Sequence, residues 1–115
     1  MFDESQIKSK AFLVKEIVDL VMSLDNMKVE KVLLVGSYAR GEENEWSDID
    51  FLVQLSKKDG RLYPTWKQIQ LIHKKLGSDR VHVIFGTIEA QASLFKRKGE
   101  KFKYREIPLL KESLC

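Results

Sequence analysis

Cysteine, proline and long apolar runs are almost absent from this chain. Its 115 residues include one cysteine, Cys115, and two prolines. A single thiol excludes a disulfide framework and a cysteine zinc site within one chain. The longest apolar runs are four to six residues, whereas a membrane-spanning helix needs roughly 20. Because the N-terminal stretch also has no apolar segment of the kind that directs secretion, we expect a cytoplasmic protein with no membrane partner.

What is present fits one folded domain. Apolar residues make up 43% and charged residues 32%, which is a globular rather than a disordered composition. We therefore expect residues 1–115 to form a single domain around one core. The net charge is only +3, but basic residues gather near the C-terminus: Lys96, Arg97, Lys98, Lys101, Lys103 and Arg105. Such a cluster predicts either a solvated surface or a weak nucleic-acid site.

Hydrophobic periodicity and capping signals predict three helices, spanning residues 5–25, 64–76 and 88–98. The first carries apolar side chains at alternating spacings of three and four, the period of an amphipathic helix. Pro64 suits the first turn of the second helix, and Gly77 suits the position just past its end. Thr87 can cap the third helix and Gly99 can end it.

Short apolar runs predict three strands, spanning residues 31–35, 48–55 and 80–85. The SKKDG segment that follows the second strand is a turn, and the tail from residue 101 is either a short edge strand or an irregular cover. The order is helix, strand, strand, helix, strand, helix, tail. It predicts an α/β (α+β) fold, with a small mixed β-sheet flanked by helices.

Two aspartates enter the second predicted strand. Side chains alternate across a strand, so Asp48 and Asp50 share one face while Ile49 and Phe51 share the other. Two ionised carboxylates at this spacing repel by about 2–3 kcal/mol at an effective dielectric of about 20. A shared proton, a basic side chain or a metal ion must offset that repulsion, and Mg²⁺ favours such a pair. Taken alone, the pair also fits a polar edge strand or a surface ion pair.

The turn that leaves the first predicted strand has the character of a phosphate site. Gly36 lets the backbone approach a ligand closely, and the amides that follow, with the Ser37 hydroxyl, can bind phosphate oxygens at a short helix start. Phosphate donors beside a metal-binding carboxylate pair predict a site for a nucleoside triphosphate.

The stretch GSYARGEENEWSDIDFLV, residues 36–53, resembles the signature of the DNA polymerase β-type nucleotidyltransferase superfamily, and in particular of its smallest members, the minimal nucleotidyltransferases. That signature is Gly-Ser, ten residues, then Asp-x-Asp, and Gly36-Ser37 with Asp48-Ile49-Asp50 match it without a gap. Four fixed positions at this spacing recur by chance in about one chain in a thousand of this length. The resemblance covers roughly residues 5–110 and implies the nucleotidyltransferase fold.

The resemblance also implies an activity and a set of site residues. An acceptor hydroxyl would attack the α-phosphorus of ATP, or of another nucleoside triphosphate, and pyrophosphate would leave. Asp48 and Asp50 would hold Mg²⁺, with Mn²⁺ as the alternative. The triphosphate would be bound by the remaining matched residues, namely Gly36 and Ser37, assisted by Arg40 or Ser47.

One position departs from the family pattern. Active members usually carry a third carboxylate on the next strand, in a pattern like Val-Asp-Leu-Val, but the strand here reads RVHVIF and His82 takes that place. Three interpretations follow. His82 acts as the general base; or the site binds nucleotide and metal without transfer; or Asp79 or Glu89 supplies the carboxylate from outside the strand.

The resemblance further suggests a protein partner. Minimal members often pair with a small all-helical HEPN-type protein, as the antitoxin of a toxin–antitoxin pair, and sometimes modify it with AMP. This chain has no room for an acceptor-binding domain, so we expect the acceptor site to come from such a partner or from a homo-oligomer.

Three aromatic side chains and a second histidine remain to be placed. Trp46 can either stack on a base or cover the core. Phe95 and Phe102 are predicted core residues, and His73 is predicted to lie on a helix face rather than to bind a metal.

Overall fold

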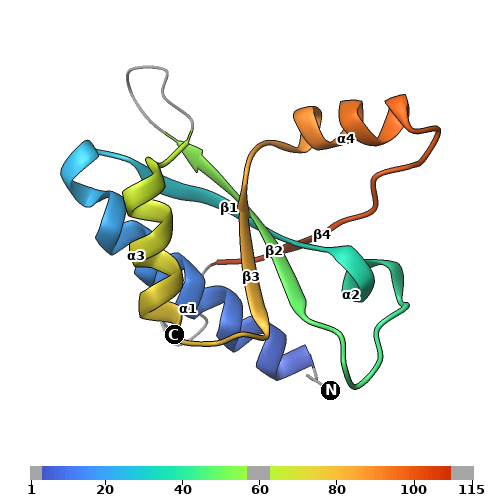
Figure 1. Ribbon diagram of the computed structural model, residues 1–115, viewed down its shortest axis with the longest axis horizontal. Coiled ribbons are helices and arrows are strands. Elements are labelled where there is room, and N and C mark those ends of the chain that lie inside the picture. Colours follow the sequence, from blue (N-terminus) through green and yellow to red (C-terminus); the bar gives the residue numbers. More distant parts are fainter. Residues whose placement is uncertain (1–3, 57–62, 110–115) are drawn as a thin grey trace.

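A four-stranded mixed sheet organises the computed structural model, which describes residues 4–56 and 63–109 (Figure 1). The elements in chain order are α1 (Glu4–Met22), the 3-10 turn η1 (Ser23–Asp25), β1 (Lys28–Val35), α2 (Gly36–Arg40), β2 (Ile49–Ser56), α3 (Trp66–Leu76), β3 (Val81–Phe85), α4 (Ile88–Arg97) and β4 (Arg105–Ile107). None of the described helices is long and apolar enough to cross a membrane.

The sheet has the strand order β3-β2-β1-β4. β1 pairs antiparallel with β2 and with β4, whereas β2 and β3 are parallel and are connected through α3. The register places Val35 opposite Asp50, and Asp50 beside His82. The end of β1, the start of β2 and the start of β3 therefore meet at one end of the sheet. The predicted fold class, a mixed sheet with flanking helices, is confirmed.

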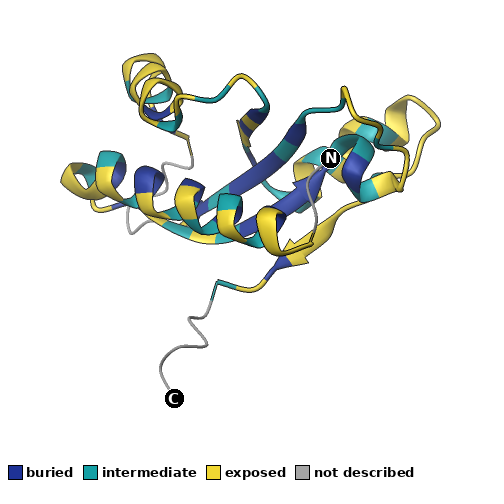
Figure 2. Cartoon of the chain, turned by 90° about the horizontal axis from the view of Figure 1, so that it is seen from below, coloured by how far each residue is buried: buried dark blue, intermediate teal, exposed yellow. Residues whose placement is uncertain are grey.

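The hydrophobic core lies mainly on one face of the sheet. Buried side chains of α1, such as Val14 and Val18, pack with Phe51 of β2 and Ile72 of α3 in one continuous cluster. Figure 2 shows the buried positions on the middle strands and along one side of α1. This arrangement follows from the three-and-four spacing of α1, which places its apolar residues on a single stripe.

The opposite face of the sheet is only partly covered. Its buried cluster contains Leu33, Val35 and Leu52, with Ile88 and Phe102 packed partly against it. No residue of α4 is buried, and this helix lies apart from α1 and α3 (Figure 1). The site described below occupies this open face.

Helix boundaries follow the capping chemistry. Thr65 is the N-cap of α3: its side chain accepts a hydrogen bond from the Gln68 amide (3.2 Å), and the Gln68 side chain accepts one from the Thr65 amide (2.7 Å). This capping box starts α3 at Trp66, so the prediction that Pro64 occupies the first turn was wrong. The Thr87 cap is confirmed, because its side chain accepts from the Ala90 amide.

Strand boundaries differ more from the prediction. β1 begins at Lys28, three residues before the predicted start, and β2 begins at Ile49, so that Asp48 precedes the strand. The tail does form an edge strand, β4, which settles the alternative left open above. Residues 57–60 of the predicted SKKDG turn lie outside the described residues.

Candidate active site

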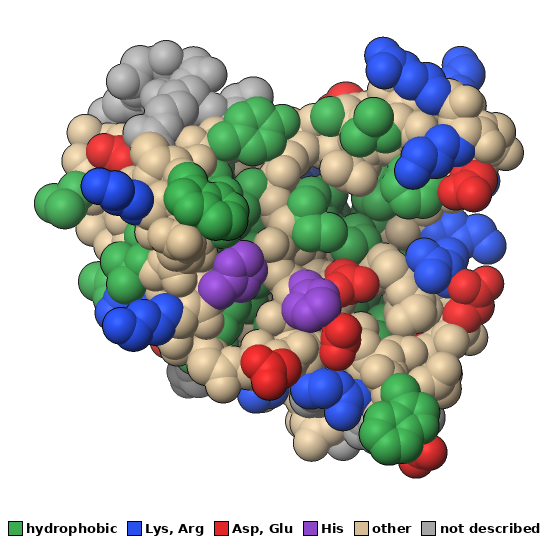
Figure 3. Space-filling model, viewed as in Figure 1, with side chains coloured by type: hydrophobic (Ala, Val, Ile, Leu, Met, Phe, Trp, Pro, Cys, Tyr) green, Lys and Arg blue, Asp and Glu red, His purple; other side chains and the backbone are tan. Residues whose placement is uncertain are grey.

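Asp48, Asp50 and His82 meet at the end of the sheet. The His82 ring lies between the two carboxylates, with Nε2 3.5 Å from Asp48 Oδ2 and Nδ1 3.3 Å from Asp50 Oδ1. Parallel pairing of β2 with β3 sets Asp50 beside His82, and the two-residue period keeps Asp48 on the same side. The structure thus brings together the three residues selected from the sequence, and Figure 3 shows the two histidines and acidic side chains gathered on one face.

The carboxylate pair has an uneven environment. The Asp50 side chain is 28% exposed and that of Asp48 is 37% exposed. Burial is the largest influence on Asp50 and raises the pKa of its carboxyl; His82 and, more weakly, Arg40 oppose the rise, whereas the charge of Asp48 adds to it. The net direction is upward, so an ionised Asp50 lacks full compensation from its protein neighbours.

Arg80 is a site residue that the sequence analysis missed. Its Nη2 donates hydrogen bonds to the backbone carbonyls of Glu45 and Ser47, each at 2.9 Å, and its Nε lies 3.6 Å from Asp48 Oδ1. Arg80 therefore ties the loop before β2 to the start of β3 and places a positive charge beside Asp48. The available signal was the two-residue spacing to His82, which puts both side chains on one side of the strand.

Gly36 joins β1 to α2 in contact with Asp50. Its φ is +72°, and a Cβ built on it would collide with Asp50 Oδ2 and lie 3.2 Å from Asp50 Cγ. Only glycine adopts this conformation without strain and also leaves room for the carboxylate. α2 then carries Ser37 in its first turn and Arg40 in its last, and a cavity of about 230 Å³ touches Gly36, Arg40 and Asp50 together.

Ser47 is not part of that cavity. Its hydroxyl accepts a hydrogen bond from the backbone N–H of Asn44 (2.9 Å), and its own backbone N–H donates to the backbone carbonyl of Asn44 (3.0 Å). Ser47 therefore shapes the loop that leads into β2. Of the predicted phosphate-binding residues, Gly36 and Arg40 line one cavity with Asp50, and Ser37 directly follows Gly36.

The two carboxylates suit a hard cation that also binds ligands from outside the protein. Within residues 4–56 and 63–109, no three His, Cys, Asp or Glu side chains are arranged to hold a metal ion. Two carboxylates on one side of a strand nevertheless match Mg²⁺, which takes one or two carboxylates plus phosphate oxygens and water. Imidazole is a less suitable ligand for Mg²⁺, so His82 fits a different task.

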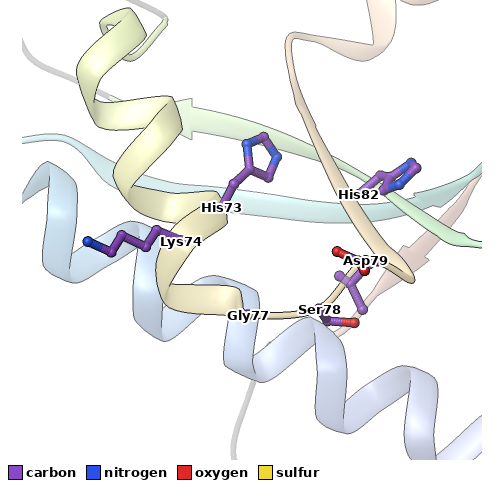
Figure 4. A pocket seen from close by; sticks show the side chains of 7 residues that line it. His73, Lys74, Gly77, Ser78, Asp79 and His82 are labelled. Carbon is purple, nitrogen blue, oxygen red and sulfur yellow. The ribbon is translucent and has the colours of Figure 1, made fainter.

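A second cavity, of about 580 Å³, adjoins the cluster at His82 (Figure 4). It lies beside β3 and the end of α3, and its lining comprises His73, Lys74, Gly77, Ser78, Asp79, Val81 and His82. His73 lies on α3, as predicted, and its side chain is exposed. Asp79 reaches this cavity from the loop before β3, whereas Glu89 is exposed in the first turn of α4.

Substitution of Gly36 tests the contact with Asp50. Gly36→Ala should lower the free energy of unfolding by about 2–4 kcal/mol, because left-handed strain and overpacking add. Gly41→Ala is the matched control: Gly41 has φ +71° but nothing within 4 Å of an added Cβ, so strain alone should cost about 1–2 kcal/mol. Chemical denaturation measures both values; equal losses would mean that Gly36 does not constrain Asp50.

The chain is similar to known nucleotidyltransferases. The profile of the family described as "Nucleotidyltransferase domain" matches residues 14–112. "Putative protein adenylyltransferase MJ1379" of Methanocaldococcus jannaschii is 40% identical over 57 residues, covering 46% of this chain and 54% of that protein. "Putative protein adenylyltransferase MJ0141" of the same organism is 36% identical over 62 residues, covering 54% of this chain and 58% of that protein. The chain thus spans little more than half the length of these relatives.

One solved structure is more distant. The crystal structure of a toxin–antitoxin with AMP-PNP aligns with 86% of this chain and 76% of that chain, at 18% identity and a TM-score of 0.42. The family profile, which covers most of the chain, agrees with the family predicted from the Gly-Ser and Asp-x-Asp motif. The chain belongs to the nucleotidyltransferase domain family.

Proposed function

We propose that this chain is a metal-dependent nucleotidyltransferase that moves a nucleoside monophosphate from ATP, or from another nucleoside triphosphate, to a hydroxyl of a protein acceptor. The observation that most supports this is the contact between Gly36 and Asp50, which puts the Gly-Ser turn and the carboxylate pair at one corner of the sheet. The family supports nucleotidyl transfer, and the names of the relatives support ATP as donor and a protein as acceptor.

In the proposed reaction the acceptor oxygen forms a bond to the α-phosphorus, the bond from that phosphorus to the bridging oxygen breaks, and pyrophosphate leaves. Asp48 and Asp50 hold Mg²⁺ or Mn²⁺, which when bound neutralises charge on the phosphate oxygens and aligns the displacement. Gly36 and Ser37 bind phosphate oxygens through backbone amides and the hydroxyl. Arg40, at the end of α2, adds positive charge to the same cavity.

His82 is proposed to take the proton of the acceptor hydroxyl. Its ring is held by two carboxylates, and an imidazole exchanges protons near neutral pH. His82 is also the residue that the cluster shares with the larger cavity (Figure 4), so the acceptor would approach from that side. We propose that a separate protein presents this hydroxyl, either an all-helical HEPN-type partner of a toxin–antitoxin pair or a second copy of this chain.

A second function is favoured by one observation. Among the described residues, no third carboxylate joins Asp48 and Asp50, and a histidine stands in that place. A subunit that binds nucleotide and metal without transferring anything would need no more than this. The two functions differ in whether pyrophosphate is released.

The intact mass of the acceptor tests the proposal. Incubation of the chain with ATP, Mg²⁺ and a co-expressed HEPN-type protein should add the mass of AMP to that protein, or to the chain itself, and release an equal amount of pyrophosphate. ATP with a methylene group between the α- and β-phosphates is the control, since that bond cannot be cleaved. Binding of ATP with neither product would contradict transfer and favour the binding subunit.

A further inference from the structure

The cavity of about 230 Å³ extends beyond the phosphate and metal residues. It lies on the open face of the sheet, between α2 and α4. Gly36, Arg40 and Asp50 line it together with residues of the sheet, of α4 and of the segment after α4: Val35, Ile84, Gln91, Phe95, Phe102 and Lys103. The cavity therefore combines the charged side chains of Arg40, Asp50 and Lys103 with an apolar, aromatic wall contributed by α4 and the segment that follows it.

The aromatic wall has a fixed geometry. The Phe95 and Phe102 rings have centroids 5.2 Å apart and are tilted by 52°, and Tyr104 stacks on Phe102 at 5.3 Å. Phe102 in turn packs against the cluster of Leu33, Val35 and Leu52 on the sheet. These contacts restrict the Phe102 ring, which stays partly exposed, and a restricted ring is preorganised for a planar ligand.

Contrary to the prediction that they are core residues, Phe95 and Phe102 do not simply complete the core. Phe95 and Phe102 are only partly buried, no residue of α4 is buried, and Leu94 and Ile84 remain 47% and 45% exposed. α4 thus lies to one side of the sheet and does not pack closely on it (Figure 1). In Figure 3, apolar side chains lie on this face between the acidic cluster and outlying basic side chains.

The size of the cavity limits what it can accept. Sites that enclose a whole small ligand measure about 300–1,000 Å³, so this cavity would enclose only a part of one. If the phosphates of a nucleotide lie along Gly36 and Arg40, the base is the part directed at Phe95 and Phe102. Aromatic rings stack on any base, and the Gln91 amide offers one donor and one acceptor for the edge of an adenine.

We propose that this cavity is the base-binding slot of the nucleotide, with Phe95 and Phe102 as its stacking wall and Gln91 as the side chain that contacts the base edge. The inference rests on the proposed function, because it takes the phosphates to lie at Gly36. Trp46 is the rival stacking residue, but it is 80% exposed in the loop before β2 and does not line the cavity.

Calorimetric titration of the whole chain in Mg²⁺ with two probes tests the slot. Tripolyphosphate presents the phosphates alone, and ATP adds the sugar and the base. ATP should bind about tenfold to a hundredfold more tightly than tripolyphosphate, the range expected for stacking of one base. Phe95→Leu, which keeps an apolar side chain, and Gln91→Ala should each reduce that ratio and leave the affinity for tripolyphosphate unchanged. Trp46→Ala should change neither affinity.

Each other outcome overturns a distinct statement. Equal affinity of the wild-type chain for both probes, or loss of the ATP advantage in Trp46→Ala alone, would overturn the slot and leave the phosphate and metal site standing. Binding of neither probe would overturn the proposed function, and the slot with it. If the ratio of the affinities for ATP and tripolyphosphate is unchanged in both Phe95→Leu and Gln91→Ala, the base binds elsewhere.

Discussion

Asp50→Asn should abolish nucleotidyl transfer while raising the melting temperature of the metal-free protein. Loss of a carboxylate that holds the cation removes several kcal/mol of charge stabilisation in the transition state, which corresponds to about a thousandfold or more in rate. The stability gain has a separate cause. Burial raises the pKa of Asp50, so its ionised form is disfavoured by folding, and a neutral amide of similar shape avoids that cost.

The pH dependence of this gain follows from the direction of the pKa shift. In the unfolded chain an aspartate has a pKa of about 3.9. The folded state holds the Asp50 proton more tightly, so the wild type loses stability as the pH rises through the raised pKa of Asp50, whereas the variant does not. The difference in melting temperature should therefore be present at neutral pH and disappear below about pH 4. Thermal denaturation across this pH range measures it.

Asp79→Asn is the matched control for Asp50→Asn. Asp79 is an exposed carboxylate in the loop before β3 and lines the larger cavity beside His82. Its substitution should leave transfer near the wild-type rate and should not raise the melting temperature. Inactivation by Asp79→Asn would instead support the interpretation that a loop carboxylate completes the site. An Asp50→Asn variant that retains full activity would remove the carboxylate pair from the mechanism.

His82→Ala has the second largest expected effect. Loss of a general base should lower the transfer rate by about a hundredfold to ten-thousandfold, with little change in the affinity for ATP and Mg²⁺, because imidazole is a poor ligand for Mg²⁺. His82→Asp restores the carboxylate that the family pattern has at this position, and should recover at least part of the lost rate. Incorporation of the labelled α-phosphate of ATP measures each variant.

The His73→Ala variant tests whether His82 acts as a specific general base or only as one of several basic groups on this surface. His73 lines the same cavity as His82 but lies on α3 and takes no part in the carboxylate cluster. The His73→Ala variant should therefore transfer the nucleotide at close to the wild-type rate. Full transfer by His82→Ala would refute the base. An inactive wild type that becomes active on His82→Asp would identify the natural protein as the nucleotide-binding subunit.

The sequence predicted most of the fold because its strongest signals are local. The three-and-four apolar spacing predicts α1, although the helix ends at Met22 and Ser23–Asp25 form a 3-10 turn, and the Thr87 cap marks the start of α4. β1 began earlier than predicted because its first three residues are mostly polar: Lys28 and Glu30 flank Val29, and the segment becomes strand only by pairing with the end of β2. β4 is three residues long and carries no pattern of its own; its pairing with β1 creates it.

The candidate site also has residues whose positions could be predicted from local sequence patterns and residues whose positions could not. Asp50 and His82 could be placed on one face because strand alternation is independent of the rest of the fold. The same alternation puts Arg80 on the side of His82, but its role could not be assigned in advance, since its partners are the backbone carbonyls of Glu45 and Ser47, and their positions depend on the path of a loop. For the same reason the engagement of Ser47 with Asn44 was not predictable.

The β1–β2 pairing affects how much the length of the segment between the two motifs can vary among related proteins. Val35 and Asp50 are partners in the antiparallel ladder, so backbone hydrogen bonds, and not the number of intervening residues, set the distance from Gly36 to the carboxylates. We therefore expect that residues can be inserted next to Glu43 with the site intact, provided that Arg80 still reaches Glu45 and Ser47 and that Arg40 keeps its ion pair with Glu42. Distant relatives are accordingly better recognised by the two ends of this hairpin than by a fixed gap of ten residues between them.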